Sequence, residues 1–326
     1  MKHSTEGVRR GRSVLRFIGR FFAVVGILLL TLAVLLTGAV ALTCKGPSAT
    51  ARDLFVTTVQ QYDSLKFLPE LFLSDGEINA ILSANRLMPT NAVTDTTFGF
   101  VENEDTDSEP IEVVTISNEN YAGKLLIIRD PSRVELACIA TFGADQPGAS
   151  VESFAELSQA VAAIGSGTDG MPSGFVIQNG NLIHGNKAQA APIIGFDASD
   201  RLIVGSMTAE QALGMGIRNA VCADSSTIIV NGKATEIAGL GDGIHARAVI
   251  AQRADGAVLL MVLDGVKSTA PGVLLEDCVR ELLKAGAVNA AVLDSGDSAA
   301  LVYQNAVQND APDAQYRRVP VAFVIR

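Results

Sequence analysis

The sequence lacks the residue patterns of several common enzyme and metal-binding classes. Its four cysteines have no C-x-x-C spacing, so they indicate no zinc ribbon and no redox pair. Its three histidines, His3, His184 and His245, are widely spaced, which argues against a histidine-rich metal site. No G-x-x-x-x-G-K-[ST] or G-x-G-x-x-G pattern joins a strand to a helix, and no G-x-S-x-G elbow occurs. Neither a nucleotide-binding fold nor a serine hydrolase is therefore supported.

Basic residues are also scarce beyond the N-terminus. The first 43 residues hold six of the 25 basic side chains and one of the 35 acidic ones, so the formal charge of the remainder is −15. Nucleic-acid affinity comes largely from cationic groups that neutralise phosphates. We therefore expect no nucleic-acid partner, and we attribute the acidic exterior to solubility.

A long apolar run near the N-terminus predicts a membrane anchor. Phe21 to Thr43 contains no charged residue and is long enough, as a helix, to cross a bilayer core of roughly 30 Å. Six basic residues and a single acid precede it, so the positive-inside rule keeps residues 1–20 as a cytoplasmic tail. Ala39-Val40-Ala41 would suit signal-peptide cleavage, but the run is longer than a usual signal core. The sequence thus predicts an uncleaved, single-pass signal-anchor in the cell membrane, with the C-terminal domain extracytoplasmic.

Residues 44–88 predict a helical collar between the anchor and the body. Lys45-Gly46-Pro47 should end the anchor helix, and an amphipathic pattern runs from Ala49 to Leu68. Ser74 and Glu77 have the spacing of a capping box at the start of a further short helix. Residues 89–110 are rich in acids but lack the order of calcium ligands, which predicts a solvated loop.

The body, residues 111–326, predicts a strand-rich, mixed α+β domain. Many short apolar runs are separated by turn signals such as Asn179-Gly180 and Asp255-Gly256. Two helical patterns interrupt them, Phe154 to Ile164 and Leu274 to Ala285. The predicted strands are Ile111–Ser117, Lys124–Ile128, Val134–Thr141, Phe175–Gln178, Leu202–Val204, Thr227–Val230, Ala246–Ala251, Val258–Leu263, Ala287–Leu293, Ala299–Tyr303 and Val319–Ile325.

Two aspartates are the strongest candidates for catalysis. Asp264 and Asp294 each end an apolar strand at a glycine-containing turn, and a helical pattern separates the two strands. Hydrolysis of a glycosidic or phosphodiester bond needs an acid, a base or a charge-stabilising carboxylate near the leaving oxygen. The alternative is that both aspartates shape turns through backbone N–H groups, and other acids such as Asp242 could also enter the site.

Two cations could hold a phosphate near these aspartates. Arg247 opens a predicted strand and can donate two parallel N–H bonds to a phosphate, or it can instead form a salt bridge with Asp242. Lys267 follows Asp264 by three residues and could supply a second cation, although an exposed lysine needs no function.

The region from about Gly216 to Arg326 resembles the phosphodiester glycosidase family, and Pro172 to Gly180 is similar to an earlier family hairpin. Order and spacing of the segments agree with the family. The segments that carry the resemblance are Ile229-Val230-Asn231-Gly232-Lys233, Arg247 to Arg253, Asp255-Gly256, Val262-Leu263-Asp264-Gly265, Gly286 to Ala290 and Leu293-Asp294-Ser295-Gly296-Asp297-Ser298.

This resemblance implies an extracytoplasmic hydrolase of sugar phosphodiesters, acting on phosphate-linked glycans in cell-envelope or exopolysaccharide metabolism. It implies Asp264 and Asp294 as catalytic residues. The other positions that match the family motifs are Arg247, Gly265, Gly296 and Ser298, which we expect to bind substrate. Lys267 and Asp297 are further candidates for substrate binding because of their places near Asp264 and Asp294, and the resemblance does not supply them.

The sequence departs from the family pattern at the expected site. An Arg-Thr pair becomes Arg247-Ala248, Asp-Gly-Arg becomes Asp264-Gly265-Val266, and a glycine after the second aspartate becomes Ser295. Ser295 would hinder a positive φ if the turn required one there. Asp297 beside Asp294 could repel a phosphate or help to hold a divalent cation. We therefore keep as alternatives a weakened member that binds a glycan and a structural envelope protein.

Overall fold

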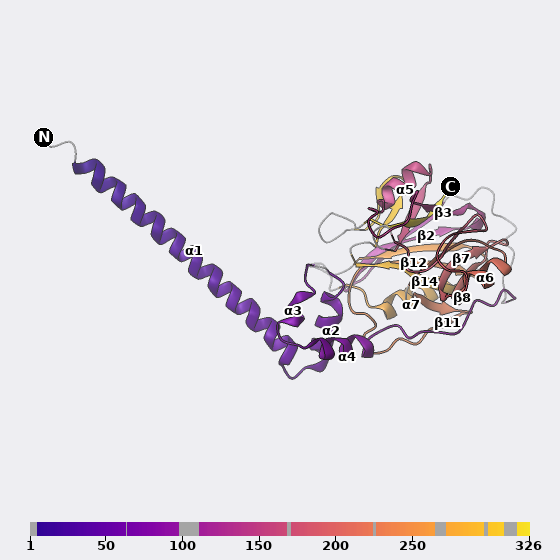
Figure 1. The fold of residues 1–326 in the computed structure, drawn as a ribbon, viewed down its shortest axis with the longest axis horizontal. Helices are drawn as coiled ribbons and strands as arrows, with labels where there is room; N and C mark the ends of the chain where they lie inside the picture. Colours follow the sequence, from indigo (N-terminus) through magenta and orange to yellow (C-terminus); the bar gives the residue numbers. More distant parts are fainter. Residues whose placement is uncertain are drawn as a thin grey trace.

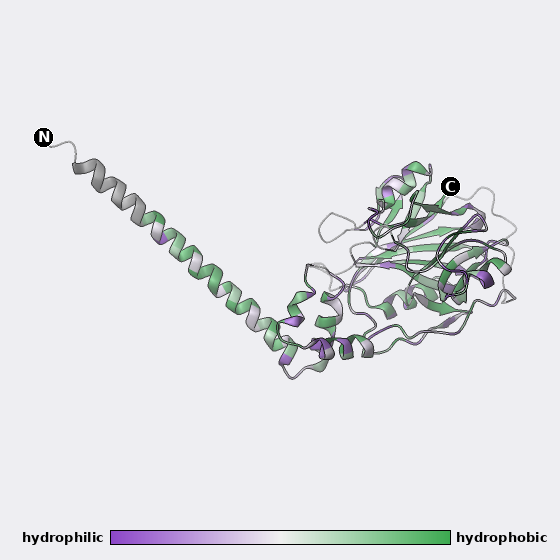
Figure 2. Ribbon diagram, viewed as in Figure 1, coloured by the Kyte–Doolittle hydropathy of each residue, from purple (hydrophilic) through white to green (hydrophobic). Residues whose placement is uncertain are grey.

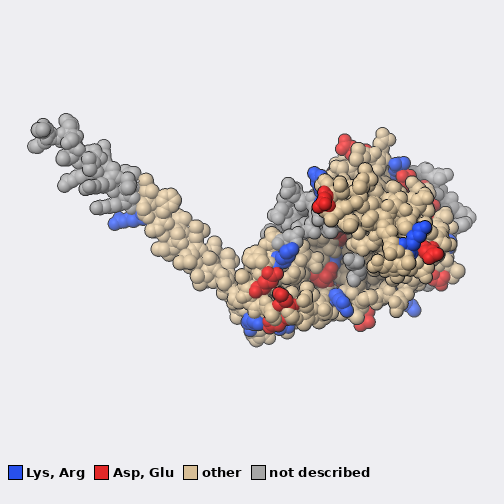
Figure 3. Space-filling view, in the orientation of Figure 1, with Lys and Arg blue, Asp and Glu red and all other residues tan. Residues whose placement is uncertain are grey.

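A long N-terminal helix projects from a strand-rich body, and short helices lie at the junction (Figure 1). The structure is a computed structural model that describes residues 5–62, 64–97, 111–167, 171–223, 226–264, 272–296, 299–309 and 318–326, with side chains from residue 17. Helix α1 spans Thr5–Lys45 and ends before Gly46-Pro47, as predicted. Its segment Phe17–Lys45 contains an 18-residue window with a mean hydropathy of 2.6, and no residue of that window is buried in the protein. Figures 2 and 3 show it as apolar and almost free of charged groups, so its length and composition suit a membrane span or a signal sequence.

Three short helices form the collar: α2 (Ala49–Val59), α3 (Phe67–Glu70) and α4 (Asp75–Ala84). The predicted capping box is confirmed, because the Glu77 N–H donates to Ser74 Oγ and the Ser74 N–H donates to Glu77 Oε2. The predicted continuous helix from Ala49 to Leu68 is wrong, because α2 ends at Val59 and the chain turns before α3. Buried Val56, Leu73 and Ile81 pack together with α1 and fix the collar to the end of that helix.

The body contains three antiparallel sheets, in agreement with the predicted α+β class. The seven-stranded sheet has the order β1 (Glu112–Ser117), β2 (Ala122–Ile128), β13 (Val258–Leu263), β12 (Arg247–Arg253), β14 (Ala287–Ser295), β10 (Thr227–Val230) and β11 (Lys233–Ala234). One five-stranded sheet has the order β16 (Ala306–Val307), β15 (Leu301–Tyr303), β4 (Ala162–Ser166), β17 (Val321–Ile325) and β3 (Val134–Cys138). The other has the order β6 (Asn181–His184), β5 (Val176–Gln178), β9 (Ile217–Cys222), β7 (Ala190–Asp197) and β8 (Leu202–Thr208).

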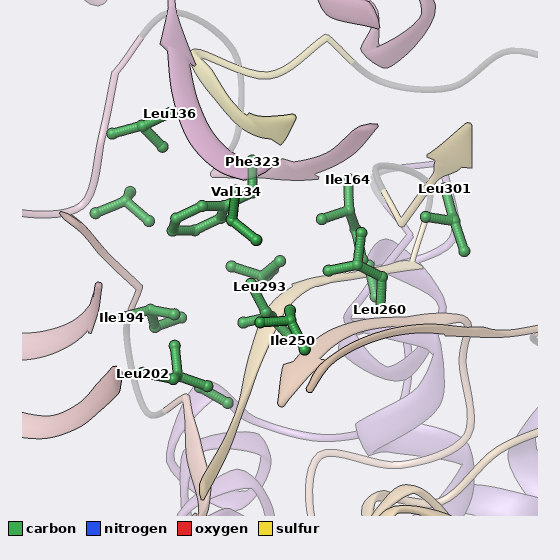
Figure 4. Close-up of a cluster of buried hydrophobic side chains, with 14 of the residues drawn as sticks. Val134, Leu136, Ile164, Ile194, Leu202, Ile250, Leu260, Leu293, Leu301 and Phe323 are labelled. Atoms are coloured by element: carbon green, nitrogen blue, oxygen red, sulfur yellow. The ribbon is translucent and has the colours of Figure 1, made fainter. Parts of the chain in front are cut away.

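The main core lies where the three sheets face one another. Figure 4 shows Ile250 and Leu293 of the seven-stranded sheet close to Phe323 of one smaller sheet and Leu202 of the other. Each of these side chains is at least 97% buried, and burial of a large apolar side chain contributes roughly 1.5–3 kcal/mol. This core holds β12 and β14 rigidly, and it thereby fixes the strand ends where the candidate site lies.

Helices cover the outer faces of the sheets. Helix α7 (Leu275–Lys284) packs against the seven-stranded sheet, α5 (Val151–Leu157) against the sheet that contains β4, and α6 (Ala209–Gly214) against the remaining sheet. A 3₁₀ turn, Pro131–Arg133, precedes β3. The helix predicted from Leu274 to Ala285 is confirmed within one residue at each end.

The helix predicted from Phe154 to Ile164 is partly wrong. Helix α5 ends at Leu157, the chain turns through Gln159 with φ +52°, and strand β4 begins at Ala162. The side chains that suggested one apolar helix face are in different surroundings, because Leu157 is 82% exposed whereas Ile164 is fully buried between β15 and β17. Spacing of apolar residues does not separate a helix from a helix–turn–strand of the same length.

Candidate active site

Three neighbouring strands end at the same edge of the seven-stranded sheet. Arg247 opens β12 and pairs with Leu263 at the end of β13 on one side and with Ser295 at the end of β14 on the other. Asp264 and Asp294 adjoin these paired positions. The strand ends that carry Asp264 and Asp294 therefore lie on either side of the start of β12, where Arg247 stands.

A cavity of about 370 Å³ opens at this edge, within the size range of ligand pockets. It is lined by Gln61, Arg86, Leu87, Gly167, Ser173, Ala223, Asp242, Arg247, Leu275, Val292, Leu293, Asp294 and Ser295. Arg247 and Asp294 thus share one cavity. Asp264 is 94% buried and is not among the described residues of its wall. The structure brings together two of the three groups expected to meet there.

The buried side chain of Arg247 forms a salt bridge with the partly exposed carboxylate of Asp242. The arginine side chain is 1% exposed, its Nη1 donates to Asp242 Oδ2 at 2.8 Å, and its Nη2 donates to Asp242 Oδ1 at 2.6 Å. The Nη2 atom also donates to the Gly243 carbonyl oxygen at 3.0 Å. Of the two alternatives raised by the sequence, a phosphate contact or a salt bridge with Asp242, the structure contains the salt bridge, which occupies the fork that a phosphate would need.

His245 completes this buried cluster. It is fully buried, and its Nε2 lies 3.3 Å from Asp242 Oδ2. Burial lowers the pKa of His245, the Arg247 charge lowers it further, and these effects outweigh the opposing influence of Asp242. Burial would raise the pKa of Asp242, but Arg247 and His245 hold it well below its usual value. The cluster is therefore an ionised Asp242–Arg247 pair beside a neutral imidazole near pH 7.

Asp294 is delivered to the cavity by an irregularity in β14. The register between β12 and β14 shifts between Ala248 and Val249, so that Ala248 pairs with Asp294 whereas Val249 pairs with Val292. Such a bulge changes the direction of the side chains that follow it. Asp294 is 9% exposed, and its Oδ1 accepts a hydrogen bond from the Ser295 N–H at 2.8 Å. A nearly buried carboxylate at a cavity wall is suited to acid–base chemistry or to charge stabilisation.

The turn after Asp294 accommodates Ser295 without the expected hindrance. Ser295 is the last residue of β14, and the positive φ of this turn, +69°, falls on Gly296. The Gly296 N–H donates to the Ala246 carbonyl oxygen at 2.9 Å and closes the turn against β12. The departure from the family glycine at Ser295 therefore does not strain the backbone.

Four predicted substrate-binding residues lie outside the described part of the chain: Gly265, Lys267, Asp297 and Ser298. Their roles remain predictions. Across the ranges that the structure describes, no three histidine, cysteine, aspartate or glutamate residues are grouped as metal ligands. The four cysteines are free thiols.

The collar supplies two residues that the sequence analysis missed. Gln61 follows α2 and Arg86 follows α4, and both line the cavity with Asp294. The Thr58 hydroxyl also accepts a hydrogen bond from the Ile244 N–H at 3.1 Å, which fastens the collar beside Asp242. No sequence signal distinguishes Arg86, because a single exposed arginine after a helix is typical of any solvated surface.

A second cavity, of about 350 Å³, shares Leu87 with the first. Its wall comes from three parts of the fold: the extended chain Leu87–Asn91, Pro192 and Ser206 of the β7–β8 hairpin, and Ser226 and Thr227 at the start of β10. The N–H of Val292, which lines the first cavity, donates to the carbonyl oxygen of Ser226, which lines the second, at 2.8 Å, so the two walls are hydrogen-bonded to each other.

Comparison with known proteins places this fold. The model of the phosphodiester glycosidase family matches residues 151–326. The catalytic domain of zebrafish N-acetylglucosamine-1-phosphodiester alpha-N-acetylglucosaminidase, auto-inhibited by its pro-peptide, has a similar structure, with a TM-score of 0.57 and 18% identity over 69% of this chain and 86% of that chain. A hypothetical protein from Synechocystis is similar with a TM-score of 0.45 and 16% identity, over 66% of this chain and 61% of that chain. No curated protein matched in a sequence search. The predicted family resemblance and fold class are confirmed.

Proposed function

Because the chain belongs to the phosphodiester glycosidase family, we propose that it is a hydrolase of sugar-phosphodiester bonds. The observation that carries the proposal is the presence of nearly buried Asp294 and buried Arg247 in the wall of one cavity of about 370 Å³ within the family domain. The zebrafish relative is named for an N-acetylglucosamine-1-phosphodiester, which suggests a sugar-1-phosphodiester as the substrate class.

Asp294 is the proposed acid or base of the reaction. Cleavage transfers the sugar to water, and the leaving phosphate oxygen must gain a proton or an equivalent stabilisation of its charge. A carboxyl group in the cavity wall can donate that proton or can accept one from water. Asp264 is the proposed second carboxylate. It follows the last residue of β13, the strand that pairs with β12, and it would act by stabilising charge at the cavity and not by direct contact with the substrate.

The proposed setting is the outer face of a cell membrane, in envelope or exopolysaccharide metabolism. Helix α1 has the length and hydropathy of a membrane span, and the basic residues that precede its apolar part favour a cytoplasmic N-terminus. In this arrangement residues 1–20 are the tail, 21–43 the anchor and 44–88 the collar. The collar then holds the cavity a short distance from the bilayer, where membrane-linked glycans are accessible.

Turnover by the full-length protein in detergent tests the function. The substrates are a nitrophenyl sugar phosphodiester and a sugar nucleotide, and the comparison is wild type with Asp294→Asn. We expect the variant to lose roughly 10²–10⁴-fold in kcat, the usual contribution of a positioned acid or base. Equal rates in the two proteins would reject the role of Asp294. Chelation with EDTA in the same assay tests the possible divalent cation beside Asp294 and Asp297.

A second candidate function is glycan binding without turnover. The observation that favours it is the engagement of both Arg247 terminal nitrogens by Asp242, which leaves this arginine without its usual phosphate-binding fork. Calorimetry separates the two functions. Saturable binding of a phosphate-linked glycan without any product would favour the binding protein, and product formation would exclude it.

A further inference from the structure

Arg86 is a cation at the cavity whose guanidinium has no partner within the part of the protein that the structure describes. Its side chain is exposed and lines the same cavity as Asp294 and Arg247. Within the described residues its guanidinium makes no hydrogen bond and no ion pair. Arg247, in contrast, donates three hydrogen bonds to Asp242 and Gly243. Of these two arginines, only Arg86 can offer its planar set of donors to a ligand without breaking an existing bond.

The backbone around Arg86 is fixed, although its side chain is not. The Ala238 N–H donates to the Arg86 carbonyl oxygen at 2.9 Å, and the Met88 N–H donates to the Glu236 carbonyl oxygen at 3.0 Å. Before it, buried Asn85 accepts from the Leu240 N–H at 3.0 Å and donates to the Ile81 carbonyl oxygen at 2.9 Å. After it, Leu87 is 95% buried. The backbone on both sides of Arg86 is therefore held by hydrogen bonds, while its guanidinium can bind a ligand.

The charges of the cavity wall require such a cation for a phosphodiester to bind. Asp242 and Arg247 form an internal ion pair whose charges largely cancel. Asp294 is a second carboxylate in this wall, and a negative charge on it would repel a phosphodiester that approaches it. A guanidinium at the same cavity offsets this repulsion and can bind two phosphate oxygens with parallel N–H bonds.

We propose that Arg86 binds the phosphate group of the substrate, so that the collar completes the binding site of the family domain. This inference rests on the proposed function only for the identity of the ligand as a phosphodiester. Arg86 lies 65 residues before the start of the match to the family model at residue 151. The collar then has two roles. It joins the family domain to α1, and it supplies a phosphate-binding residue that the family domain does not contain.

Binding of inorganic phosphate and a sugar 1-phosphate to the full-length protein in detergent tests this inference. Calorimetry would compare wild type with Arg86→Ala, Arg86→Lys and the control Lys187→Ala, which removes the same charge from an exposed residue outside both cavities. Loss of a charge-assisted hydrogen-bond donor should weaken affinity roughly 10–100-fold in Arg86→Ala. Arg86→Lys, which keeps the charge without the fork, should lose less, and Lys187→Ala should bind as wild type does.

The outcomes separate this inference from the proposed function. Arg86-dependent phosphate binding without turnover of any phosphodiester would support the role of Arg86 and reject the hydrolase. Turnover with a KM that is unchanged in Arg86→Ala would support the hydrolase and overturn the role of Arg86. Absence of phosphate binding in the wild type would also overturn it. Thermal melting should be nearly equal in Arg86→Ala and wild type, because among the described residues the Arg86 side chain makes no hydrogen bond or ion pair that the substitution would remove.

Discussion

The two arginines of the cavity come from different regions of the chain and have opposite surroundings. Arg247 begins β12, is 1% exposed and is bound through both terminal nitrogens to Asp242. Arg86 comes from the collar, is exposed, and has a fixed backbone with an uncommitted guanidinium. The comparison indicates that the family domain uses its arginine to build the cavity wall, whereas the collar provides the cation that is available to a ligand.

This difference follows from the cost of burying charge. A guanidinium taken out of water needs a charged partner and hydrogen-bond acceptors, and Asp242 and Gly243 supply these to the two terminal nitrogens of Arg247. An exposed guanidinium needs neither and stays ready to bind an anion. Arg247, one of the two cations predicted from the sequence to hold a phosphate, is therefore paired with Asp242, which is the alternative that the sequence also raised. Arg86, which has no sequence signal, has the donors that the proposed phosphate site needs.

The largest expected effect is a difference in stability between the two arginine substitutions. Arg247→Ala should lower the free energy of unfolding by about 3 kcal/mol, because it leaves the Asp242 carboxylate without its buried partner. The value lies at the low end for such pairs because the Asp242 side chain is 37% exposed. Arg86→Ala should change stability by less than about 0.5 kcal/mol. Urea denaturation of both variants measures this difference. Equal stabilities would contradict the conclusion that Arg247 supports the fold whereas the Arg86 side chain does not.

A smaller effect is expected from loosening the collar segment behind Arg86. Asn85→Ala removes the acceptor of the Leu240 N–H and the donor to the Ile81 carbonyl, and buried polar groups left without partners cost about 1–3 kcal/mol. Phosphate affinity should fall together with stability although Asn85 does not line the cavity. Asn85→Asp keeps the acceptor but places a buried carboxylate oxygen against the Ile81 carbonyl oxygen, so it should be destabilised as well. Lower stability with unchanged phosphate affinity would show that Arg86 does not need a fixed backbone.

The smallest effect is a pH dependence of stability that arises from His245 and Asp242, the neighbours of Arg247, and not from Arg86. His245 has a lowered pKa in the folded protein, whereas its pKa in the unfolded chain is about 6.5. Below about pH 6.5 the unfolded state therefore binds a proton that the folded state does not, and stability falls as the pH decreases. The contribution of Asp242, whose folded pKa is also lowered, is lost only below about pH 4.

Denaturation midpoints at pH 7.5 and pH 5.5 measure this dependence. His245→Asn should reduce the loss of stability between the two pH values, even if it is less stable than wild type at both. Arg86→Ala should retain the dependence of the wild type. An identical pH dependence in His245→Asn and wild type would show that His245 does not titrate differently in the folded and unfolded states.

Most strands at the candidate site were predictable because they are continuous apolar runs between turn signals. The predicted bounds of β10 and β13 match the structure, and β12 and β14 differ by only one or two residues at their ends. Strands β7 and β9 were missed, since Pro192 and Gly195 interrupt one and Arg218 and Asn219 the other. Their strand conformation depends on pairing with each other within the sheet.

The sequence by itself determined an apolar N-terminal helix, an α+β body of the phosphodiester glycosidase family and the strand ends that carry Asp264, Arg247 and Asp294. These features are local, because apolar runs, turn residues and motif spacing are read along the chain. Only the tertiary structure decided three further features. Asp242 forms a salt bridge with Arg247, Asp264 is not part of the cavity wall, and Arg86 is part of it. These features depend on contacts between remote segments, and no pattern of neighbouring residues specifies which charge will be buried with a partner and which will remain free.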